Sequence, residues 1–316
     1  YETVTTVGEV SNFESEAEER IIFPFGTEDG RGSLYVQLDA TRLGTLGSAV
    51  RYVFHYPYGC LEQRSSAILP LIAFGEYIQV FGLESQVDNP FAVVQAELSE
   101  WAKVQKKDGG FPYWSDGEKS SYAVSLRIGE ILSIATERDI EIPSALNVKR
   151  LANYLKSETE RLKKENALPL YAASYAMYVL TRLGKNVTDN DIEAIILSKE
   201  VGTSELCFAG LSALEKGNTA LAQKAATRLK NYIALTVRGA SFQTATPWYG
   251  WYFFNGQGER YALALHFLTK LNVEDVYNTH IVWQLLEEQK SSRGYWHSTA
   301  DTARVLIALE AYIKAN

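Results

Sequence analysis

The sequence is poor in cysteine, methionine and long apolar runs, and these shortages exclude several classes of protein. Its 316 residues include two cysteines and one methionine. Two cysteines cannot make a disulfide framework, although the count permits one bond between Cys60 and Cys207. No apolar run approaches the ~20 residues that span a bilayer, so we expect no membrane insertion in this segment. There is no recognisable signal peptide, and we interpret the chain, which begins at Tyr1, as a processed protein or a piece of a larger one.

Positive charge and metal ligands are also scarce. The formal net charge is -7, which argues against nucleic-acid binding because that function favours a basic face. The four histidines do not lie at metal-ligand spacings with the cysteines, so we expect no metal and no cofactor. Cys207 lies in the apolar stretch 206–210, where we expect a buried structural thiol.

Two regions with different periodicity follow one another along the chain. Residues 1–40 hold short β-branched or alternating segments at 2–7, 20–25 and 33–38, separated by turns, which predicts strands of a β domain. From residue 41 the period is helical. Nothing after residue 45 indicates a convincing strand. Helices are predicted near 61–77, 91–101, 120–137, 144–164, 169–184, 189–199, 203–216, 219–233, 259–271, 274–289 and 299–314.

A loose internal repeat runs through the helical region. Each unit is a turn rich in glycine and aromatic residues, followed by a helix with small residues on one side. The turns 105–114, 249–252 and 289–296 precede the helical segments 121–126, 261–265 and 299–306. Such units stack on their neighbours, and a closed ring removes the need for capping units. We expect the aromatic side chains to fill the gaps between successive helix pairs.

The segment 56–63 reads Tyr-Pro-Tyr-Gly-Cys-Leu-Glu-Gln and places Cys60 three residues before Gln63. Residues three apart at the start of a helix face each other. The Cys60 thiolate can therefore attack the side-chain amide of Gln63, expel ammonia and close an internal thioester. Gly59 is expected to supply unusual backbone dihedrals. Glu62 either assists proton transfer or is a solvated carboxylate in the first turn.

Aromatic residues near this motif could keep water from such a bond. Tyr56 and Tyr58 are the local candidates for a shelter. A second group, in the run 248–254, contributes Trp248, Tyr249, Trp251 and Tyr252, unless these side chains serve only ordinary packing between helices. His55, five residues before Cys60, either takes part in the chemistry or packs locally.

The motif 56–63, with the helix and repeats that follow it, resembles the thioester domain of the alpha-2-macroglobulin and complement family. Leu61 matches the bacterial members. The resemblance implies a mainly α fold, an α/α toroid of about six helical hairpins over residues 41–316. It also implies that residues 1–40 belong to a flanking β-sandwich module of the CUB type. The motifs 105–111 and 296–303 are similar to those of α/α toroids in general.

What the resemblance implies about function is a bacterial protease inhibitor that is not an enzyme. A protease would cleave a bait region elsewhere in the parent chain, and its lysine would attack Gln63 and be trapped covalently. Expected partners are target proteases and other domains of the parent, in the periplasm or at the cell surface. Some relatives use a histidine that would fall between residues 145 and 175 to direct transfer to hydroxyls. This chain has none there, so we expect attack by amines.

Two alternatives remain open from the sequence. One is an α/α-toroid enzyme of the terpene cyclase or prenyltransferase type, although the sequence has neither an Asp-x-Asp-Asp run nor an evident zinc cluster. The other is an interaction module whose thioester never forms. The mass of the intact protein would separate these alternatives from the thioester hypothesis.

Overall fold

A computed structural model describes residues 46–57, 59–81, 89–237, 239–243, 253–254, 256–292 and 294–316. The expected β segment of residues 1–40, with its boundary at residue 41, lies outside these residues and stays a prediction. Within the described residues, no helix is long and apolar enough to cross a membrane.

The described part of the chain is mainly helical. Its elements are α1 (Gly47–Phe54), α2 (Leu61–Phe74), a 3-10 segment η2 (Gly75–Phe81), α3 (Pro90–Val104), α4 (Tyr122–Glu137), α5 (Val148–Lys164), α6 (Leu170–Arg182), α7 (Asp189–Leu197), α8 (Thr203–Glu215), α9 (Thr219–Lys230), β1 (Ile233–Thr236), β2 (Gly239–Phe242), α10 (Gln257–Leu271), α11 (Val276–Ser291) and α12 (Thr299–Ala315).

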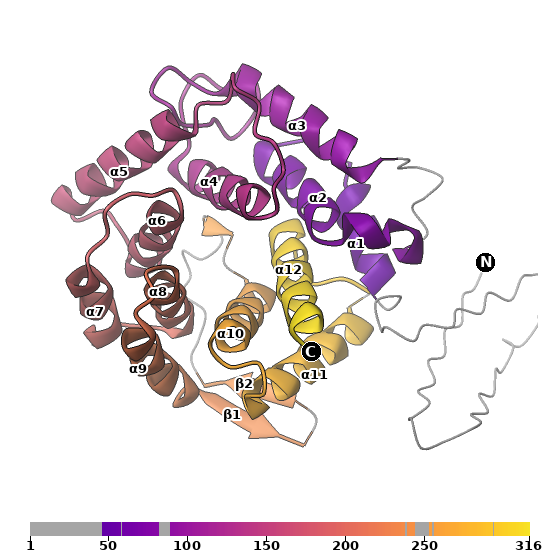
Figure 1. Cartoon of the computed structure of the whole chain (residues 1–316), viewed down its shortest axis with the longest axis vertical. Coiled ribbons are helices and arrows are strands. Elements are labelled where there is room, and N and C mark those ends of the chain that lie inside the picture. The colour runs from indigo at the N-terminus through magenta and orange to yellow at the C-terminus, as the bar shows by residue number, and fades with distance from the viewer. Residues whose placement is uncertain are drawn as a thin grey trace, which may run out of the picture. The chain divides into compact units, whose positions relative to one another are not determined.

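The helices alternate between an inner and an outer ring. Figure 1 shows α2, α4, α6, α8, α10 and α12 around the centre, with α1, α3, α5, α7, α9 and α11 outside them. The last inner helix, α12, packs on the first, α2, and so closes the ring. This arrangement of six outer–inner pairs confirms the prediction of a mainly α, α/α-toroid fold.

The composition of each helix decides which ring it joins. The inner helix α4 is buried from Tyr122 through Ala135, and α12 is buried from Thr299 through Glu310. The outer helix α5 is charged on most of its surface and buries Leu151, Ala152 and Leu155. A helix with apolar and small residues all round needs neighbours on every side, whereas an amphipathic helix needs them on one.

Small residues allow the inner helices to approach closely. A Cβ atom added to Gly210 in α8 would overlap the Phe267 ring of α10. At Gly129 in α4, an added Cβ would lie 2.9 Å from Val179 of α6. These positions explain why the repeat keeps small residues on one side of its inner helices.

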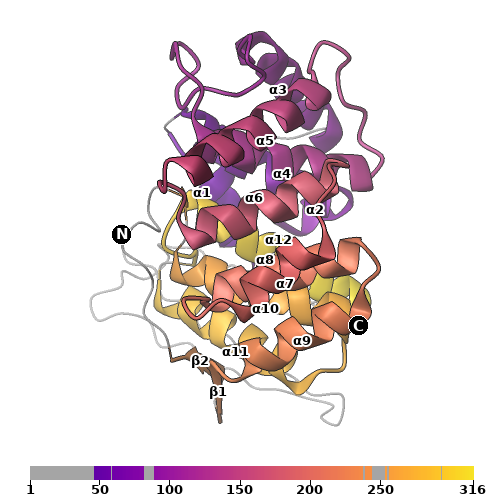
Figure 2. The same cartoon turned by 90° about the vertical axis from the view of Figure 1, so that its left-hand side faces the viewer.

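A β-hairpin interrupts the helical pattern, which the sequence did not predict. The predicted helix 219–233 ends at Lys230, and β1 pairs antiparallel with β2 so that Ile233 lies opposite Phe242. The hairpin packs against α11 at the edge of the ring (Figures 1 and 2). Ile233 and Ala240 are buried there, so packing overrides the helical propensity of this stretch.

The inner helices point in the same direction, as contacts between their first turns show. Thr299 of α12 donates a hydrogen bond to Glu62 of α2. Tyr171 of α6 donates to Glu259 of α10. The turns that precede the inner helices are therefore gathered at one end of the ring. Among the described residues, Cys60 and the turn 105–114 before α4 lie at that end.

Candidate functional site

Cys60 and Gln63 meet across the first turn of α2, as their spacing predicts. Cys60 is the N-cap residue and has an extended backbone, with φ at -65° and ψ at 157°. The Cys60 backbone N–H donates to Gln63 Oε1 at 3.2 Å, while the Gln63 backbone N–H donates to the Cys60 side chain. This is the geometry of a capping box with sulfur in place of the usual hydroxyl. The two side chains that a thioester would join are thus held together by backbone hydrogen bonds.

The Cys60 thiol is buried, with 1% of the residue exposed. Burial raises the pKa of the thiol, because the thiolate loses hydration, and nearby hydrogen-bond donors offset only part of this effect. A helix N-terminus favours a thiolate, but desolvation is the larger effect here. A thiol with a raised pKa is a slower leaving group. The site is therefore suited to storing an acyl bond.

Glu62 is neither solvated nor turned towards the surface. It is 5% exposed, and its carboxylate accepts hydrogen bonds from Ser66 Oγ at 2.6 Å and from Thr299 Oγ1 at 3.1 Å. The alternative of a solvated carboxylate in the first turn is therefore wrong. Glu62 joins α2 to the first turn of α12 inside the ring.

A buried charge cluster lies between the inner helices beyond Glu62. Arg304 of α12 donates to both carboxylate oxygens of Glu130 in α4, at 2.5 and 2.7 Å. Its Nε lies 2.8 Å from Glu259 Oε1. Burial alone would raise the pKa of Glu130, but Arg304 and Arg127 outweigh it and lower that pKa to about 2. Burial raises the pKa of Glu259 to about 8 against the effect of Arg304.

The cluster supports the fold and offers no evident metal site. The described residues contain no group of three or more histidine, cysteine, aspartate or glutamate side chains that could hold a metal ion. Ion-paired side chains from α4, α10 and α12 fill the region between these inner helices.

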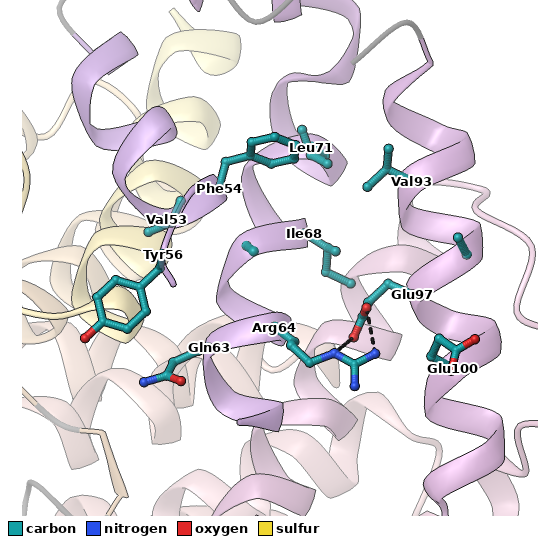
Figure 3. A pocket seen from close by; sticks show the side chains of 12 residues that line it. Val53, Phe54, Tyr56, Gln63, Arg64, Ile68, Leu71, Val93, Glu97 and Glu100 are labelled. Carbon is teal, nitrogen blue, oxygen red and sulfur yellow. Dashed lines mark hydrogen bonds and ion pairs between the residues drawn. The ribbon is translucent and has the colours of Figure 1, made fainter. Parts of the chain in front are cut away.

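An open pocket with a volume of about 360 Å³ adjoins Gln63 on the outer side of α2. Its walls come from α1, α2 and α3, and Figure 3 shows Tyr56 and Gln63 on one side and the Arg64–Glu97 ion pair on another. Arg64 Nε lies 2.8 Å from Glu97 Oε1. The indole of Trp101 donates to the same oxygen at 2.6 Å. The pocket therefore combines an apolar wall with fixed charges beside the Gln63 side chain.

The loop before α4 is tied to the start of α2. The Leu61 backbone N–H donates to the Tyr113 carbonyl at 3.0 Å. Arg64 donates to Ser115 Oγ at 3.1 Å. Burial, with a smaller contribution from the nearby Cys60, raises the pKa of Tyr113 to about 12. Neither Tyr113 nor Ser115 was a predicted site residue, because the packing of α4 against α2, and not sequence spacing, brings this turn to the start of α2.

Some of the remaining predicted site residues lie in the part of the chain that the structure describes, and others lie outside it. Leu61 is fully buried and Tyr56 is half-buried, with its ring 5.6 Å from the Tyr52 ring. A Cβ at Gly59 would meet nothing within 4 Å among the described residues, so lack of space does not require glycine there. The shelter candidates Tyr58, Trp248, Tyr249, Trp251 and Tyr252 lie outside the described residues and stay predictions.

Two residues of the second aromatic run are described. Phe253 is buried, with its ring 6.1 Å from Tyr171. The Phe254 ring lies 6.5 Å from that of Tyr113. The end of the run therefore reaches the loop that contacts Cys60.

The other cysteine and His55 have no contact with the site that the structure records. Cys207 is fully buried, burial raises the pKa of its thiol, and neither cysteine is in a disulfide. This confirms the expected structural thiol and shows that the permitted disulfide is not formed. His55 is exposed, and its ring lies 5.1 Å from the Phe54 ring, in line with local packing.

Comparison with known proteins gives a relative in sequence and several in structure. No family model matches the sequence. Alpha-2-macroglobulin of Escherichia coli K12 is 30% identical over 142 residues, which are 41% of this chain and 8% of the relative. The chain thus corresponds to a small part of that protein's length.

Solved structures of the same kind share the fold. A crystal structure of Salmonella alpha-2-macroglobulin reacted with methylamine matches with a TM-score of 0.68 at 20% identity, over 84% of this chain and 17% of that one. Escherichia coli alpha-2-macroglobulin activated by porcine elastase matches with a TM-score of 0.63 at 18% identity, over 81% of this chain and 23% of that one. The sequence relative makes the chain a homologue of bacterial alpha-2-macroglobulin, and the solved structures show that the fold is shared.

Proposed function

We propose that this chain is the thioester domain of a larger bacterial alpha-2-macroglobulin-like protease inhibitor. The domain holds a bond between Cys60 and Gln63 and uses it once, to capture an attacking protease. It is a single-use acyl donor and not a turnover enzyme. The observation that carries this proposal is the reciprocal hydrogen bonding of Cys60 and Gln63 at the start of α2, where the Cys60 thiol is buried.

Formation of the bond is an intramolecular acyl transfer. The Cys60 sulfur attacks the side-chain carbonyl carbon of Gln63, the carbon–nitrogen bond breaks, and ammonia leaves with the thiol proton. The capping geometry supports this step because it holds both groups in one turn, and such positioning contributes up to ~7–11 kcal/mol. The same burial that raises the thiol pKa also excludes water from the product.

Use of the bond reverses the roles of the two residues. An amine attacks the acyl carbon of Gln63, the carbon–sulfur bond breaks, and Cys60 leaves as a thiolate that takes up the proton lost by the amine. The new bond is an amide between Gln63 and the target. The pocket beside Gln63 gives a nucleophile access to that carbon from the outer side of α2. The Salmonella relative was reacted with methylamine, a small amine.

The proposed targets are proteases, which react through a lysine side chain after cleaving the parent chain elsewhere. The Escherichia coli relative is activated by elastase, a protease. Because this chain lacks a histidine between residues 145 and 175, the proposal includes a preference for amines over hydroxyls. The proposed setting is the periplasm or the cell surface. Tyr56, Tyr58 and the aromatic residues of 248–252 would shelter the bond there.

The intact mass of the protein tests the proposal. The parent chain should be lighter than its sequence by one ammonia, and methylamine should add its full mass at Gln63. Cys60→Ala and Gln63→Ala should abolish both effects and all covalent capture of a protease. Cys207→Ala is the matched control, because it removes the other buried thiol, and it should retain both effects. An unshifted mass together with a freely alkylated Cys60 in freshly isolated protein would refute the proposal.

A further inference from the structure

We propose that the pocket beside Gln63 is a subsite for the aliphatic stem of the attacking amine, so that it favours lysine side chains over small amines. This inference rests on the proposed thioester function and adds a binding site for the nucleophile to it. The pocket has a volume of about 360 Å³ and lies between α1, α2 and α3.

The pocket follows the outer face of α2 away from the proposed acyl carbon. Gln63, Ala67 and Leu71 all line it, and their spacing places them on one stripe of the helix. This stripe extends over about 12 Å. Figure 3 shows Gln63 at one end of the pocket and Ile68 between it and Leu71. A lysine side chain has a flexible four-carbon stem, so the stem can lie in the pocket while its nitrogen reaches Gln63.

The walls beside this stripe are apolar. Ile68 and Leu71 of α2 are almost fully buried. Phe54 at the end of α1 and Val93 in α3 are half-buried and also line the pocket. Methylene groups that leave water for such walls stabilise the bound state. A lysine stem is a chain of methylene groups and methylamine has none, so the walls favour lysine.

The charges of the pocket favour a cation over an anion. Its described lining holds one guanidinium, that of Arg64, and two carboxylates, those of Glu97 and Glu100. Glu100 is about half exposed and pairs with Lys103, which is itself exposed, so this pair is weak. With one positive and two negative side chains, the lining attracts an approaching ammonium ion and repels a carboxylate.

The Arg64–Glu97 pair forms a fixed wall before any amine arrives. Arg64 contacts the two oxygens of Glu97 at 2.8 and 2.9 Å and donates to Ser115 Oγ at 3.1 Å. Trp101, which is fully buried, donates to Glu97 Oε1 at 2.6 Å. The ion pair is thereby anchored to the core between α2 and α3. A site that is already formed binds without a cost for ordering its side chains.

The pocket acts on binding and leaves the chemistry of transfer unchanged. The ammonium ion first loses a proton to solvent. The neutral nitrogen then attacks the acyl carbon of Gln63, the carbon–sulfur bond breaks, and its electron pair passes to Cys60 with the proton that the nitrogen loses. The stem keeps its contacts with the walls throughout. Such uniform binding raises the second-order rate constant of the reaction.

The test compares amines of nearly equal basicity on the full parent chain. The rate of adduct formation is followed by intact mass. n-Butylamine should react about five- to tenfold faster than methylamine, because its three additional methylene groups are partly buried and each contributes at most about fourfold. 5-Aminopentanoate has a four-carbon stem with a carboxylate at its far end, and it should lose this advantage because the pocket is apolar and negatively charged.

Two variants and a control place the effect in the pocket. Ala96 is exposed on α3 and lines the pocket, so Ala96→Phe fills the space without disturbing the core. It should bring the n-butylamine rate down to that of methylamine and change the methylamine rate by less than about twofold. Val93→Thr makes a wall more polar and should reduce the advantage of n-butylamine by about twofold. Ala220→Phe, at an exposed position of α9, is the matched control and should keep the full advantage.

Equal rates for methylamine and n-butylamine in the unmodified parent would overturn the inference. An equal loss of both rates in Ala96→Phe would also overturn it, since that is obstruction without selection. If Ala96→Phe instead hastened loss of the thioester to water and left the ratio of the two rates unchanged, another part of the parent would occupy the pocket, and the inference would again be wrong. Failure of the proposed function looks different: the parent would neither lack one ammonia nor add methylamine, and the subsite would fall with it.

Discussion

Arg304 is the residue whose removal should most clearly separate stability from acyl chemistry. It is buried, contacts both oxygens of Glu130 and lies against Glu259. Arg304→Met keeps much of the side-chain volume but leaves Glu130 buried opposite Tyr175 and Arg127 alone. Breaking a buried pair in this way costs about 3–5 kcal/mol.

The lowered pKa of Glu130 gives a second measure of the free energy that this ion pair contributes to folding. Its value falls from 4.5 to about 2 in the folded protein. A shift of this size corresponds to stabilisation on the order of 3 kcal/mol at neutral pH. Because the folded pKa is depressed, this contribution is complete above about pH 4.5 and is lost as the pH falls towards 2. Arg304→Met should therefore lower neutral stability and flatten the acid limb of the stability curve.

Urea unfolding, followed by tryptophan fluorescence and far-UV circular dichroism, measures the effect. Arg304→Met with Glu130→Gln should recover about half of the loss or more, since Glu130 then no longer leaves a buried charge without Arg304. Arg161→Met is the control: that side chain is half exposed and pairs with Glu158 and Glu165, so its removal should barely move the midpoint. A loss below about 1 kcal/mol for Arg304→Met would refute the account of the cluster.

Three further predictions concern the same scaffold. The pKa of Glu259 is raised in the folded protein, so the folded state loses stability as the pH rises from about 4.5 to 8. Glu259→Gln should make this loss smaller. Urea unfolding midpoints at pH 5 and pH 8 measure the loss. Gly210→Ala should cost about 1–3 kcal/mol through overlap with the Phe267 ring, and Phe267→Leu in the same chain should recover part of it. If the Glu62 carboxylate only accepts hydrogen bonds such as that from Thr299, Glu62→Gln should still form the thioester, which the intact mass measures. A folded Glu62→Gln protein without the thioester would favour the proton-transfer role.

The local part of the site was predictable from the sequence, because it depends on neighbours. Cys60 and Gln63 are three residues apart at a helix start, and that spacing alone brings them together. The positions of the helices followed from their periodicity in the same way. The hairpin of β1 and β2 was not predictable, since its short strands depend on packing against α11.

The non-local part could not be predicted from one sequence. Thr299 lies 237 positions from Glu62 and Tyr113 lies 53 positions from Cys60, and nothing in the spacing links them. The available signal was the repeat itself: turns that precede the inner helices of a closed ring must gather at one end. Which residues of those turns meet the start of α2 depends on the packing of each turn: the Tyr113 carbonyl accepts from the Leu61 N–H, whereas Phe111 is buried.

The toroid offers a place for the proposed thioester on an inner helix without weakening that helix. The first turn of α2 is the point where the helix dipole and free N–H groups can bind a leaving thiolate, and it is also where the neighbouring turns converge. In the proposed function, burial disfavours the thiolate and so favours storage of the bond, while backbone donors at the sulfur would lower the barrier once an amine reaches Gln63. On the other face of the same turn, Glu62 holds α2 to α12. Because these two faces use different side chains, Cys60 can change its bonding while the ring stays closed.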